Sequence, residues 1–550
     1  MITHVRIQNL RSLVDTGFVE IKPLTILLGS NSSGKSSFLR SFPLFTQSVT
    51  KSLREPISWF DDSYVDFGDY DTAKSKFALK GEGIIFSYKI QIPLNFRTRY
   101  FFSIKDDSSS FTILPNSTIS LSFIKDSIGI FVNRITIKND ELNVEFSIKD
   151  RDSYVDMIVN GESVMEEYKF KWYYSSNRSL IPEFEFQYKF EDLMNSREAI
   201  MSIEFLINKY ANAVIRKYCS KKLKHDERIW DIISNWTHNK LFFLNFLQRS
   251  KMNTLRKNAS LWNIENDKFK EIYNSLALLY TVRSLDSFDE EIKSMYKDCS
   301  YIAPMRAAAN RYYRTQGLQI RDVDPYGKNL QEFISSLSGK REKSYRSFTE
   351  KVLGLQVIVK NNAGHQQIIL KSKYGENNMT DVGFGYSQIL PIVTKLWHSN
   401  YQLKYEGQVG SYWKNMFSHI MLIEQPELHL HPAMQARIID IIMLLLKEID
   451  NDNILLNEKH IKNKLLGREK MYSSLIIETH SQTMINRIGR RIREKQFSAD
   501  KVSILMFEKN HETGKSEIKE IKFNDKGQLI NWPLGFFEPN EDEYDILFNK

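Results

Sequence analysis

Leu24-Thr-Ile-Leu-Leu-Gly29-Ser30-Asn31-Ser32-Ser33-Gly34-Lys35-Ser36-Ser37 joins a short apolar run to a loop framed by two glycines. The spacing G-x-x-x-x-G-K-S, placed after a strand and before a helix, is that of a phosphate-binding loop. Gly29 and Gly34 let the backbone curl so that successive N–H groups face an anion at a helix N-terminus. We expect Lys35 to neutralise the β- and γ-phosphates of a nucleotide and the Ser36 hydroxyl to ligate Mg²⁺.

A second apolar strand is expected over Ile420–Ile423, and it runs directly into Glu424-Gln425-Pro426-Glu427. Ligands of open α/β sheets bind at the carboxyl ends of the strands. A phosphate loop also needs an acidic residue on the magnesium side, and we assign that role to Glu424. An acidic surface turn would explain the apolar run, but it would not explain why the run accompanies a phosphate loop.

Two further segments complete the candidate site. A third apolar strand, Ser474–Ile477, ends in Glu478-Thr479-His480-Ser481, so His480 could reach a γ-phosphate or position a water molecule. Asp381-Val-Gly383-Phe-Gly385-Tyr-Ser387-Gln388 precedes a helix expected over Ile389–Trp397 and would form another anion-receptive helix start. Taken alone, that last segment is also an ordinary helix cap.

The remaining chain separates into regions of different periodicity. Residues 76–190 alternate apolar and polar side chains with period two, as in Phe86–Ile92, Val144–Ile148 and Phe184–Phe190, which predicts an antiparallel sheet with one wet face. Residues 191–300 are helical in pattern, and from 301 onward short strands alternate with helices. We therefore expect five parts, namely 1–75, 76–190, 191–300, 301–500 and a C-terminal tail over 501–550.

One segment carries the whole charge imbalance of this 550-residue chain. Lys209–Lys257 holds 12 Lys or Arg against 3 Asp or Glu, a surplus equal to the net charge of +9. Such a focused field suits a phosphate backbone, and aromatic residues lie among the charges, as on a stacking surface. The alternative is a helical arm with a solvated basic face and aromatics turned into its core. The candidate nucleic-acid contacts are Lys217, Lys221, Lys222, Lys224, Lys251 and Arg256.

Composition excludes several classes of protein. At 42% hydrophobic and 26% charged residues, with no apolar run of about 18 residues, the sequence predicts a soluble protein of the cytoplasm without a membrane segment. Its two cysteines, Cys219 and Cys299, cannot build a disulfide framework or a four-thiolate zinc site. No zinc spacing, H-N-H constellation or G-x-S-x-G occurs, and the 70 residues after His480 lack the clustered acids of a metal-dependent nuclease.

Taken in chain order, these motifs resemble those of the ABC-type ATPase heads of the SMC, RecF and OLD families. Gly29–Ser36 resembles the Walker A loop, Gly383–Gln388 the signature, Ile420–Glu424 Walker B, Glu427–Pro432 the D-loop, and His480 the switch histidine. The resemblance covers about 1–50 and 375–485 and implies an α/β, P-loop ATPase head of ABC type (RecF/SMC-like). This head would carry an antiparallel β subdomain and an inserted helical subdomain.

The resemblance implies ATP and Mg²⁺ as cofactors and catalytic roles for Lys35, Glu424, Gln425, Glu427 and His480. Nucleotide would contact Gly29, Ser30, Asn31, Ser32, Ser33, Gly34, Lys35, Ser36 and Ser37. It would also contact Gly385 and Ser387 of a second copy in a homodimer or higher oligomer. Arg306, Arg311 and Arg314 could face phosphates or form a salt bridge between domains.

Within that set the chain is most similar to the ATPase subunit (PtuA) of Septu-type antiphage systems, including the form encoded beside retrons. The similarity lies in Tyr301-Ile-Ala-Pro304-Met-Arg306, Gly327-Lys-Asn329-Leu, Asp381–Pro391, Ile423–Pro432 and Trp532-Pro-Leu-Gly-Phe-Phe537. It implies a separate HNH nuclease chain as partner. In retron versions it also implies a reverse transcriptase and its reverse-transcribed DNA–RNA product.

One position departs from the pattern of ABC heads. The residue after the Walker B acid is normally a glutamate that polarises the attacking water, and here it is Gln425. An amide cannot act as a general base, a role worth about 10²–10⁴ in rate. Glu427 or His480 compensates, Gln425 itself orients water as a glutamine does in some GTPases, or hydrolysis is slow, and we favour slow turnover.

The sequence thus predicts an ATPase that serves as the sensor or regulatory subunit of an antiphage complex and controls a separate nuclease, without nuclease activity of its own. The alternatives are a RecF/SMC-like DNA-repair ATPase, an OLD-like self-sufficient nuclease and a non-hydrolysing, nucleotide-gated scaffold.

Overall fold

The computed structural model describes most of the chain. The described residues are 2–51, 53–91, 114, 116–151, 153–166, 168, 170–173, 180–188, 199–220, 227–297, 299–314, 320–362, 364–406, 417–462, 471–510 and 512–532. Contacts divide the chain into two compact units whose segments alternate along the sequence. The first unit comprises 1–19, 47–59 and 67–297, and the second comprises 20–46, 60–66 and 298–550. The five-part division expected from the sequence stays a prediction.

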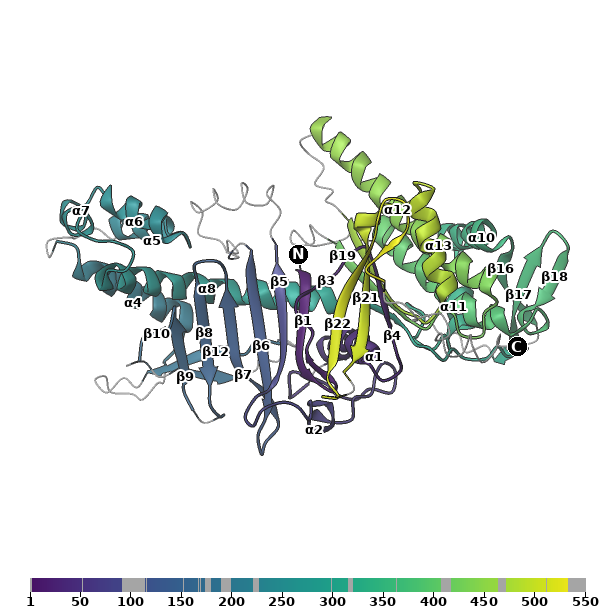
Figure 1. Ribbon diagram of the computed structural model, residues 1–550, viewed down its shortest axis with the longest axis horizontal. Helices are drawn as coiled ribbons and strands as arrows, with labels where there is room; N and C mark the ends of the chain where they lie inside the picture. Colours follow the sequence, from purple (N-terminus) through teal and green to yellow (C-terminus); the bar gives the residue numbers. More distant parts are fainter. Residues whose placement is uncertain are drawn as a thin grey trace, which may run out of the picture. The chain divides into compact units, whose positions relative to one another are not determined.

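The first unit is built on a nine-stranded sheet whose main path is antiparallel (Figure 1). Its main path runs in the order β10-β9-β8-β7-β6-β5-β1-β2, and β3 pairs with β1. The strands are β1 (Ile2–Leu10), β2 (Leu13–Asp15), β3 (Val19–Glu20), β5 (Ile84–Ile90), β6 (Ser117–Lys125), β7 (Ile130–Lys138), β8 (Asn143–Ile148), β9 (Val155–Val159) and β10 (Glu162–Ser163). In β8 and β9 buried residues alternate with more exposed ones, so the predicted sheet with one wet face is confirmed here.

A three-stranded sheet and the helices make up the rest of the first unit. The sheet is β11-β12-β13, with β11 (Phe170–Tyr173), β12 (Glu183–Tyr188) and β13 (Ala199–Ser202). The helices are α2 (Tyr70–Ala73), α4 (Ile203–Lys217), α5 (Glu227–Ser234), α6 (Lys240–Gln248), α7 (Asn253–Ala259) and α8 (Asp267–Lys297). The stretch that begins at Phe184 therefore does not extend the large sheet, because β12 pairs with β11 and β13 instead.

The second unit is built on a seven-stranded sheet in the order β14-β19-β20-β4-β21-β22-β23. The strands are β4 (Leu24–Gly29), β14 (Ser300–Ile302), β19 (Phe417–Glu424), β20 (Met471–Glu478), β21 (Val502–Lys509), β22 (Ser516–Phe523) and β23 (Leu529–Ile530). The first five in this order are parallel, and β22 and β23 continue antiparallel from β21. All six residues of β4 are buried, as expected for a parallel strand covered on both faces.

Helices and a small sheet complete the second unit (Figure 1). The helices are α1 (Lys35–Thr50, its end in the first unit), α9 (Leu330–Ser336), α10 (Gly339–Leu353), α11 (Phe384–Tyr401), α12 (Pro432–Lys462) and α13 (Gln482–Arg493). Shorter turns are η1 (Met379–Asp381), the π-helical η2 (Gln402–Glu406) and η3 (Ala499–Lys501). The small sheet holds β15 (Tyr313–Arg314), β16 (Gln356–Asn362), β17 (His365–Ser372) and β18 (Gly375–Asn378). One hydrophobic core joins the parallel strands to α9–α13.

The fold class is confirmed. A glycine-rich loop follows a central strand of a largely parallel sheet, and an antiparallel β part and a helical part precede the later strands of that sheet, which is the α/β arrangement predicted for an ABC-type head. One expected boundary is wrong, because α11 begins at Phe384 rather than near Ile389. Gly383 takes φ +102° as its N-cap, which turns the chain into the helix earlier.

Candidate functional site

The phosphate-loop segment has the predicted local structure, with β4 ending at Gly29 and α1 beginning at Lys35. Gly29 and Gly34 have φ of +143° and +98°, a region that favours glycine. A Cβ on Gly29 would also collide with the carbonyl oxygen of Phe507, because β21 runs beside it in register. The two glycines are therefore required by the backbone itself.

Lys35 lies inside the loop. Its Nζ donates hydrogen bonds to the carbonyl oxygens of Gly29 at 2.9 Å and Ser30 at 2.7 Å. The residue is 3% exposed, and burial lowers the pKa of Lys35. The ammonium group thus spans the loop where phosphate would bind, and it can exchange carbonyl partners for phosphate oxygens.

Three strand ends meet this loop. In the parallel sheet Glu424 of β19 is in register with Glu478 of β20, and Glu478 is in register with Leu27 of β4. Segments about 400 residues apart in the chain therefore converge on Ser36. The expected convergence of the glycine loop with the acidic strand end is present in the structure.

The carboxylate that contacts Ser36 is Glu478. Ser36 Oγ donates a hydrogen bond of 2.8 Å to Glu478 Oε1. Glu478 is 2% exposed, and its Oε2 is buried without a hydrogen-bond partner among the described residues. Burial, with the neighbouring charge of Glu424, raises the pKa of Glu478 to about 7. The charges of Lys35 and Arg40 oppose this rise of the pKa, but neither group is hydrogen-bonded to Glu478.

Glu424, the acid assigned to the magnesium side, has other partners. Arg40 grips it with two hydrogen bonds of 2.8 Å, from Nε to Oε1 and from Nη2 to Oε2. The Tyr301 hydroxyl donates a third, of 2.7 Å, to Oε1. Glu424 is 2% exposed, and the hydrogen bond with Glu424 raises the pKa of Arg40. Glu424 therefore lies at the site, and its charge is balanced by protein groups.

The turn after Glu424 holds the next two candidates. Gln425 has φ +42°, and its N–H donates to the carbonyl oxygen of Glu478 at 2.8 Å. Glu427 accepts hydrogen bonds from the Thr479 hydroxyl at 2.8 Å and from the His480 N–H at 2.7 Å. The carboxylate of Glu427 thus fastens the turn after β20, and both its oxygens have protein donors.

His480 closes the site on the β20 side. Its Nε2 is buried without a hydrogen-bond partner among the described residues. Burial lowers the pKa of His480, and the positive charge of Lys35 lowers it further. The ring is therefore neutral at physiological pH, with one nitrogen ready to accept or donate a hydrogen bond.

Arg306 hydrogen-bonds the backbone of the turn that follows β19. It donates to the carbonyl oxygens of Ala303 at 3.1 Å, Gln425 at 3.1 Å and Glu424 at 3.4 Å. Burial lowers the pKa of Arg306 to about 10. Its bonds to the Glu424 and Gln425 carbonyl groups position the backbone of this turn.

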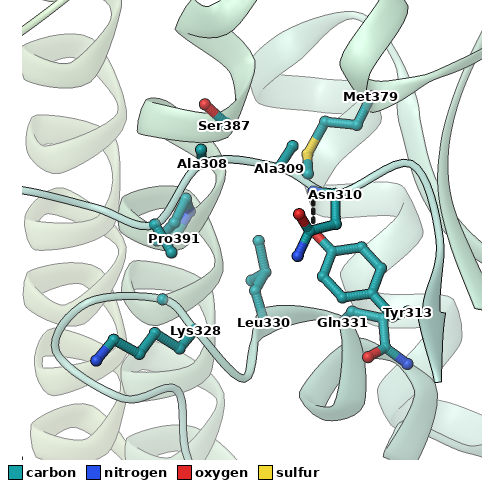
Figure 2. Close-up of a pocket in the computed structure, with 12 residues that line it drawn as sticks. Ala308, Ala309, Asn310, Tyr313, Lys328, Leu330, Gln331, Met379, Ser387 and Pro391 are labelled. Atoms are coloured by element: carbon teal, nitrogen blue, oxygen red, sulfur yellow. Dashed lines mark hydrogen bonds between the residues drawn. The ribbon is translucent and has the colours of Figure 1, made fainter. Parts of the chain in front are cut away.

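Only part of the signature-like segment Gly383–Gln388 is exposed to solvent. Ser387 is 4% exposed and donates its hydroxyl to the carbonyl oxygen of Phe384 at 2.6 Å. It lines a pocket of about 140 Å³ together with Ala308, Asn310 and Pro391 (Figure 2). None of the residues that line this pocket belongs to the phosphate loop.

Sequence reasoning missed Arg40 and Tyr301 and gave Glu478 no role. A signal for Arg40 was present, because it lies four residues after Ser36 on α1 and therefore on the same helix face. Glu478 ends an apolar strand as Glu424 does, so both qualified by the same rule.

The basic segment Lys209–Lys257 forms α4–α7. Of its candidate contacts, Lys221, Lys222 and Lys224 lie outside the described residues. Lys217, Lys251 and Arg256 are exposed, and Lys217 forms an ion pair with Glu271 at 2.5 Å.

The aromatic residues of this segment divide between core and surface. Trp236 and Phe243 are buried, and Trp236 stacks on Tyr280 with ring centroids 4.7 Å apart. Trp230 and Phe242 are 45% and 67% exposed. Only part of the predicted stacking surface is therefore accessible.

Within the described part of the chain, no helix has the length and apolar character needed to cross a membrane. The same residues contain no group of three or more His, Cys, Asp or Glu side chains that could hold a metal ion.

Comparison with known proteins identifies the family. Residues 1–485 match the family model described as "AAA ATPase domain", so the chain belongs to this family of ATPases. No curated protein matches the sequence.

Among solved structures, the chain is similar to an Smc head bound to the C-terminal winged-helix domain of ScpA, at 10% identity and TM-score 0.31, covering 95% of this chain and 97% of that one. A Pyrococcus furiosus Smc head with an extended coiled coil, bound to the C-terminal domain of ScpA, gives 10% identity and 0.31, with 95% and 96% covered. The SMC head domain from Thermotoga maritima gives 6% and 0.31, with 94% and 98% covered. At this identity and TM-score no function is transferred from them.

Proposed function

Starting from membership of this ATPase family, we propose that the chain binds ATP with Mg²⁺ at Gly29–Ser36, hydrolyses it slowly and acts as a regulatory subunit for a separate nuclease. The observation that carries the nucleotide site is the convergence of Lys35, Ser36, Glu424 and Glu478 at three adjoining strand ends. These residues supply what a triphosphate and its magnesium need, namely a cation, a hydroxyl and buried carboxylate oxygen.

Each part of the site has a distinct task. The loop N–H groups and Lys35 bind phosphate oxygens, and His480 can hydrogen-bond the terminal phosphate or a water molecule through its free nitrogen. Ser36 with a buried carboxylate fits Mg²⁺, which would neutralise phosphate charge when bound. Glu427 and Arg306 keep the two turns in place.

Replacing Lys35 tests the nucleotide site. Lys35→Ala should weaken the binding of a fluorescent ATP analogue by at least about tenfold, since a charge-assisted contact to phosphate is lost. Lys22→Ala is the matched control, because Lys22 precedes β4 and does not contact the loop. Equal affinity of wild type and Lys35→Ala would refute the assignment.

Slow hydrolysis rests on Gln425. Glu427 already holds the Thr479 hydroxyl and the His480 N–H, so it would act as a base only while keeping these two structural hydrogen bonds. Gln425→Glu should raise the rate of phosphate release, with about 10²-fold as the lower end of what a general base contributes. Brisk turnover by the wild type, unchanged in Gln425→Ala, would show that another group activates water.

The regulatory role rests on the resemblance to Septu-type ATPase subunits. It implies a separate HNH nuclease and, in a retron setting, a reverse transcriptase with its DNA–RNA product. Co-expression with the neighbouring reading frames, followed by purification and mass measurement, should recover a complex whose nuclease activity depends on Lys35.

The same preparations separate the alternatives. Cleavage of DNA or RNA by the single chain would favour an OLD-like nuclease. DNA-stimulated ATPase without a nuclease partner would favour a RecF/SMC-like repair protein. ATP binding with no phosphate release in any complex would favour a scaffold.

Dimerisation through nucleotide follows from the same resemblance. Val382 and Phe384 are 37% and 51% exposed, so the outer face of the signature-like segment, rather than Ser387, is the part available to a second copy. Light scattering should show an ATP-dependent rise in mass that Phe384→Asp prevents. A mass that ATP does not change would argue against a nucleotide-bridged dimer.

Nucleic-acid contact is proposed for the exposed basic residues of α4–α7. The double variant Lys251→Glu/Arg256→Glu should weaken nucleic-acid binding and flatten its dependence on salt. Lys519→Glu, an exposed change on β22, is the control. An unchanged salt slope would favour a solvated helical arm.

A further inference from the structure

The ends of β19 and β20 place two buried carboxylates side by side. Glu424 and Glu478 are in register on adjacent parallel strands, which lie about 4.8 Å apart. Two buried negative charges so close repel each other unless cations separate them. Arg40 forms an ion pair with only one of the two acids, Glu424, whereas Lys35 acts on Glu478 through its charge without a hydrogen bond to it.

Both oxygens of Glu424 already have protein donors. Oε1 accepts hydrogen bonds from Arg40 Nε and Tyr301, and Oε2 accepts from Arg40 Nη2. A metal ion that bound Glu424 directly would lie against the bidentate guanidinium of Arg40 and compete with its charge, and such arginine–carboxylate pairs are among the strongest in proteins.

Glu478 has the opposite environment. Its Oε1 accepts the hydroxyl of Ser36, which is the hydroxyl that phosphate loops offer to Mg²⁺. Its Oε2 is buried and has no hydrogen-bond partner among the described residues, although a buried polar atom is costly to leave unpaired. A hard cation bound beside Ser36 would supply the partner that this oxygen lacks.

We propose that Glu478, and not Glu424, is the carboxylate that holds Mg²⁺ together with Ser36. Glu424 is then a positioning residue that anchors α1 to the sheet through Arg40. This inference rests on the proposed nucleotide site, and it assigns the metal to a different strand end from the one expected from the Walker B position.

The test compares two isosteric variants by nucleotide binding rather than by turnover. The affinity of a fluorescent ATP analogue is measured for wild type, Glu478→Gln and Glu424→Gln, once with Mg²⁺ and once with EDTA. The quantity compared between variants is the affinity with Mg²⁺ divided by the affinity in EDTA. Glu478→Gln should lower this ratio by at least about tenfold, since a charged ligand of the metal becomes an amide.

Binding without metal supplies a second readout. In EDTA, Glu478→Gln should bind the analogue as well as wild type or more tightly, because a negative charge leaves the phosphate site. Glu424→Gln should keep the magnesium ratio within about threefold of wild type. Loss of the ratio in Glu424→Gln with retention in Glu478→Gln would overturn the proposal.

Folding is checked by circular dichroism and by thermal melting. If Glu478→Gln does not fold, Glu478→Asp replaces it, since the shorter carboxylate keeps the charge and withdraws the oxygen; an unchanged ratio in that variant would also overturn the proposal. Mn²⁺ provides a direct measurement, because its EPR signal reports metal bound with ATP and should be lost in the Glu478 variant. Failure of wild type to bind ATP at all would refute the proposed function, whereas a ratio that neither variant changes would refute this inference alone.

Discussion

Two arginine–carboxylate pairs in the second unit have nearly the same bond geometry and different surroundings. Arg40 donates to both oxygens of Glu424 at 2.8 Å, and Arg311 donates to both oxygens of Asp381 at 2.7 and 3.1 Å. The Glu424 side chain is 2% exposed, while that of Asp381 is 45% exposed. Bond length alone would predict equal contributions of the two pairs to stability. Burial makes the Arg40–Glu424 pair necessary for the structure, whereas solvent can replace the partners in the Arg311–Asp381 pair.

The strongest test of that difference is Arg40→Ala. It leaves the Glu424 carboxylate buried with one remaining donor, Tyr301, and should destabilise the protein by about 3 kcal/mol, at the low end for a broken buried pair because Arg40 is itself a third exposed. Urea unfolding and thermal melting measure the effect. The double variant Arg40→Ala/Glu424→Gln should recover part of the loss, since it removes the stranded charge.

An Arg40→Ala protein as stable as wild type would mean that Glu424 is not held as a charged group. Arg437→Ala is a suitable control, because Arg437 donates only a weak bond of 3.5 Å to the carbonyl oxygen of Leu353.

Two buried histidines extend the comparison to groups that burial keeps uncharged. Burial lowers the pKa of His419, at the start of β19, and of His398, on α11, to about 4 each. Asp322 opposes this effect, while Lys395 and Arg341 add to it. Unfolding frees both rings to protonate near pH 6.5, so the unfolded state binds more protons between pH 6.5 and about 4.

The contribution of these two histidines to stability should therefore be complete above pH 6.5 and fall as the pH drops toward 4, while Glu478, whose pKa is raised to about 7, acts in the opposite sense over part of this range. Each histidine contributes a slope of up to about 1.4 kcal/mol per pH unit. His419→Gln should reduce the slope of melting temperature against pH, whereas His365→Ala, at an exposed position on β17, should leave it unchanged. A slope that His419→Gln leaves unchanged would contradict the buried, neutral state of this ring.

Tyr301→Phe sharpens the comparison within the buried pair. It removes one hydrogen bond to Glu424 and leaves Arg40 in place, so the expected loss is about 1–2 kcal/mol, less than for Arg40→Ala. The ranking, measured by urea midpoints in one buffer, separates the contribution of the ion pair from that of the hydroxyl. A larger loss in Tyr301→Phe than in Arg40→Ala would reverse our account of what holds Glu424.

The same contrast explains how far the sequence could go. The spacing from Gly29 to Ser36 encodes a local backbone path, so β4, the loop and α1 could be predicted from adjacent residues. Apolar runs that end in acids likewise predicted β19 and β20. Which acid faces Ser36 could not be predicted, because it depends on strand register across more than fifty residues and on Arg40, 384 residues before Glu424.

Which aromatic side chains of the basic segment are buried was also beyond the sequence pattern. Trp236 and Phe242 both lie in the basic segment, yet the first packs on Tyr280 and the second is exposed. Arg306 and Arg311 both allowed a phosphate contact or a salt bridge. In the structure Arg306 donates hydrogen bonds to three backbone carbonyl groups, and Arg311 pairs with the exposed carboxylate of Asp381.

The smallest effect is expected from Arg311→Ala. The pair with Asp381 is bidentate, but both side chains are about half exposed, so water can replace each lost hydrogen bond and salt screens the attraction. The melting temperature of Arg311→Ala should match that of wild type within error at physiological salt, under the conditions in which Arg40→Ala is clearly destabilised. If the two variants lost equal stability, burial would not be what distinguishes the pairs. The anchoring of α1 through Glu424 would then need another explanation.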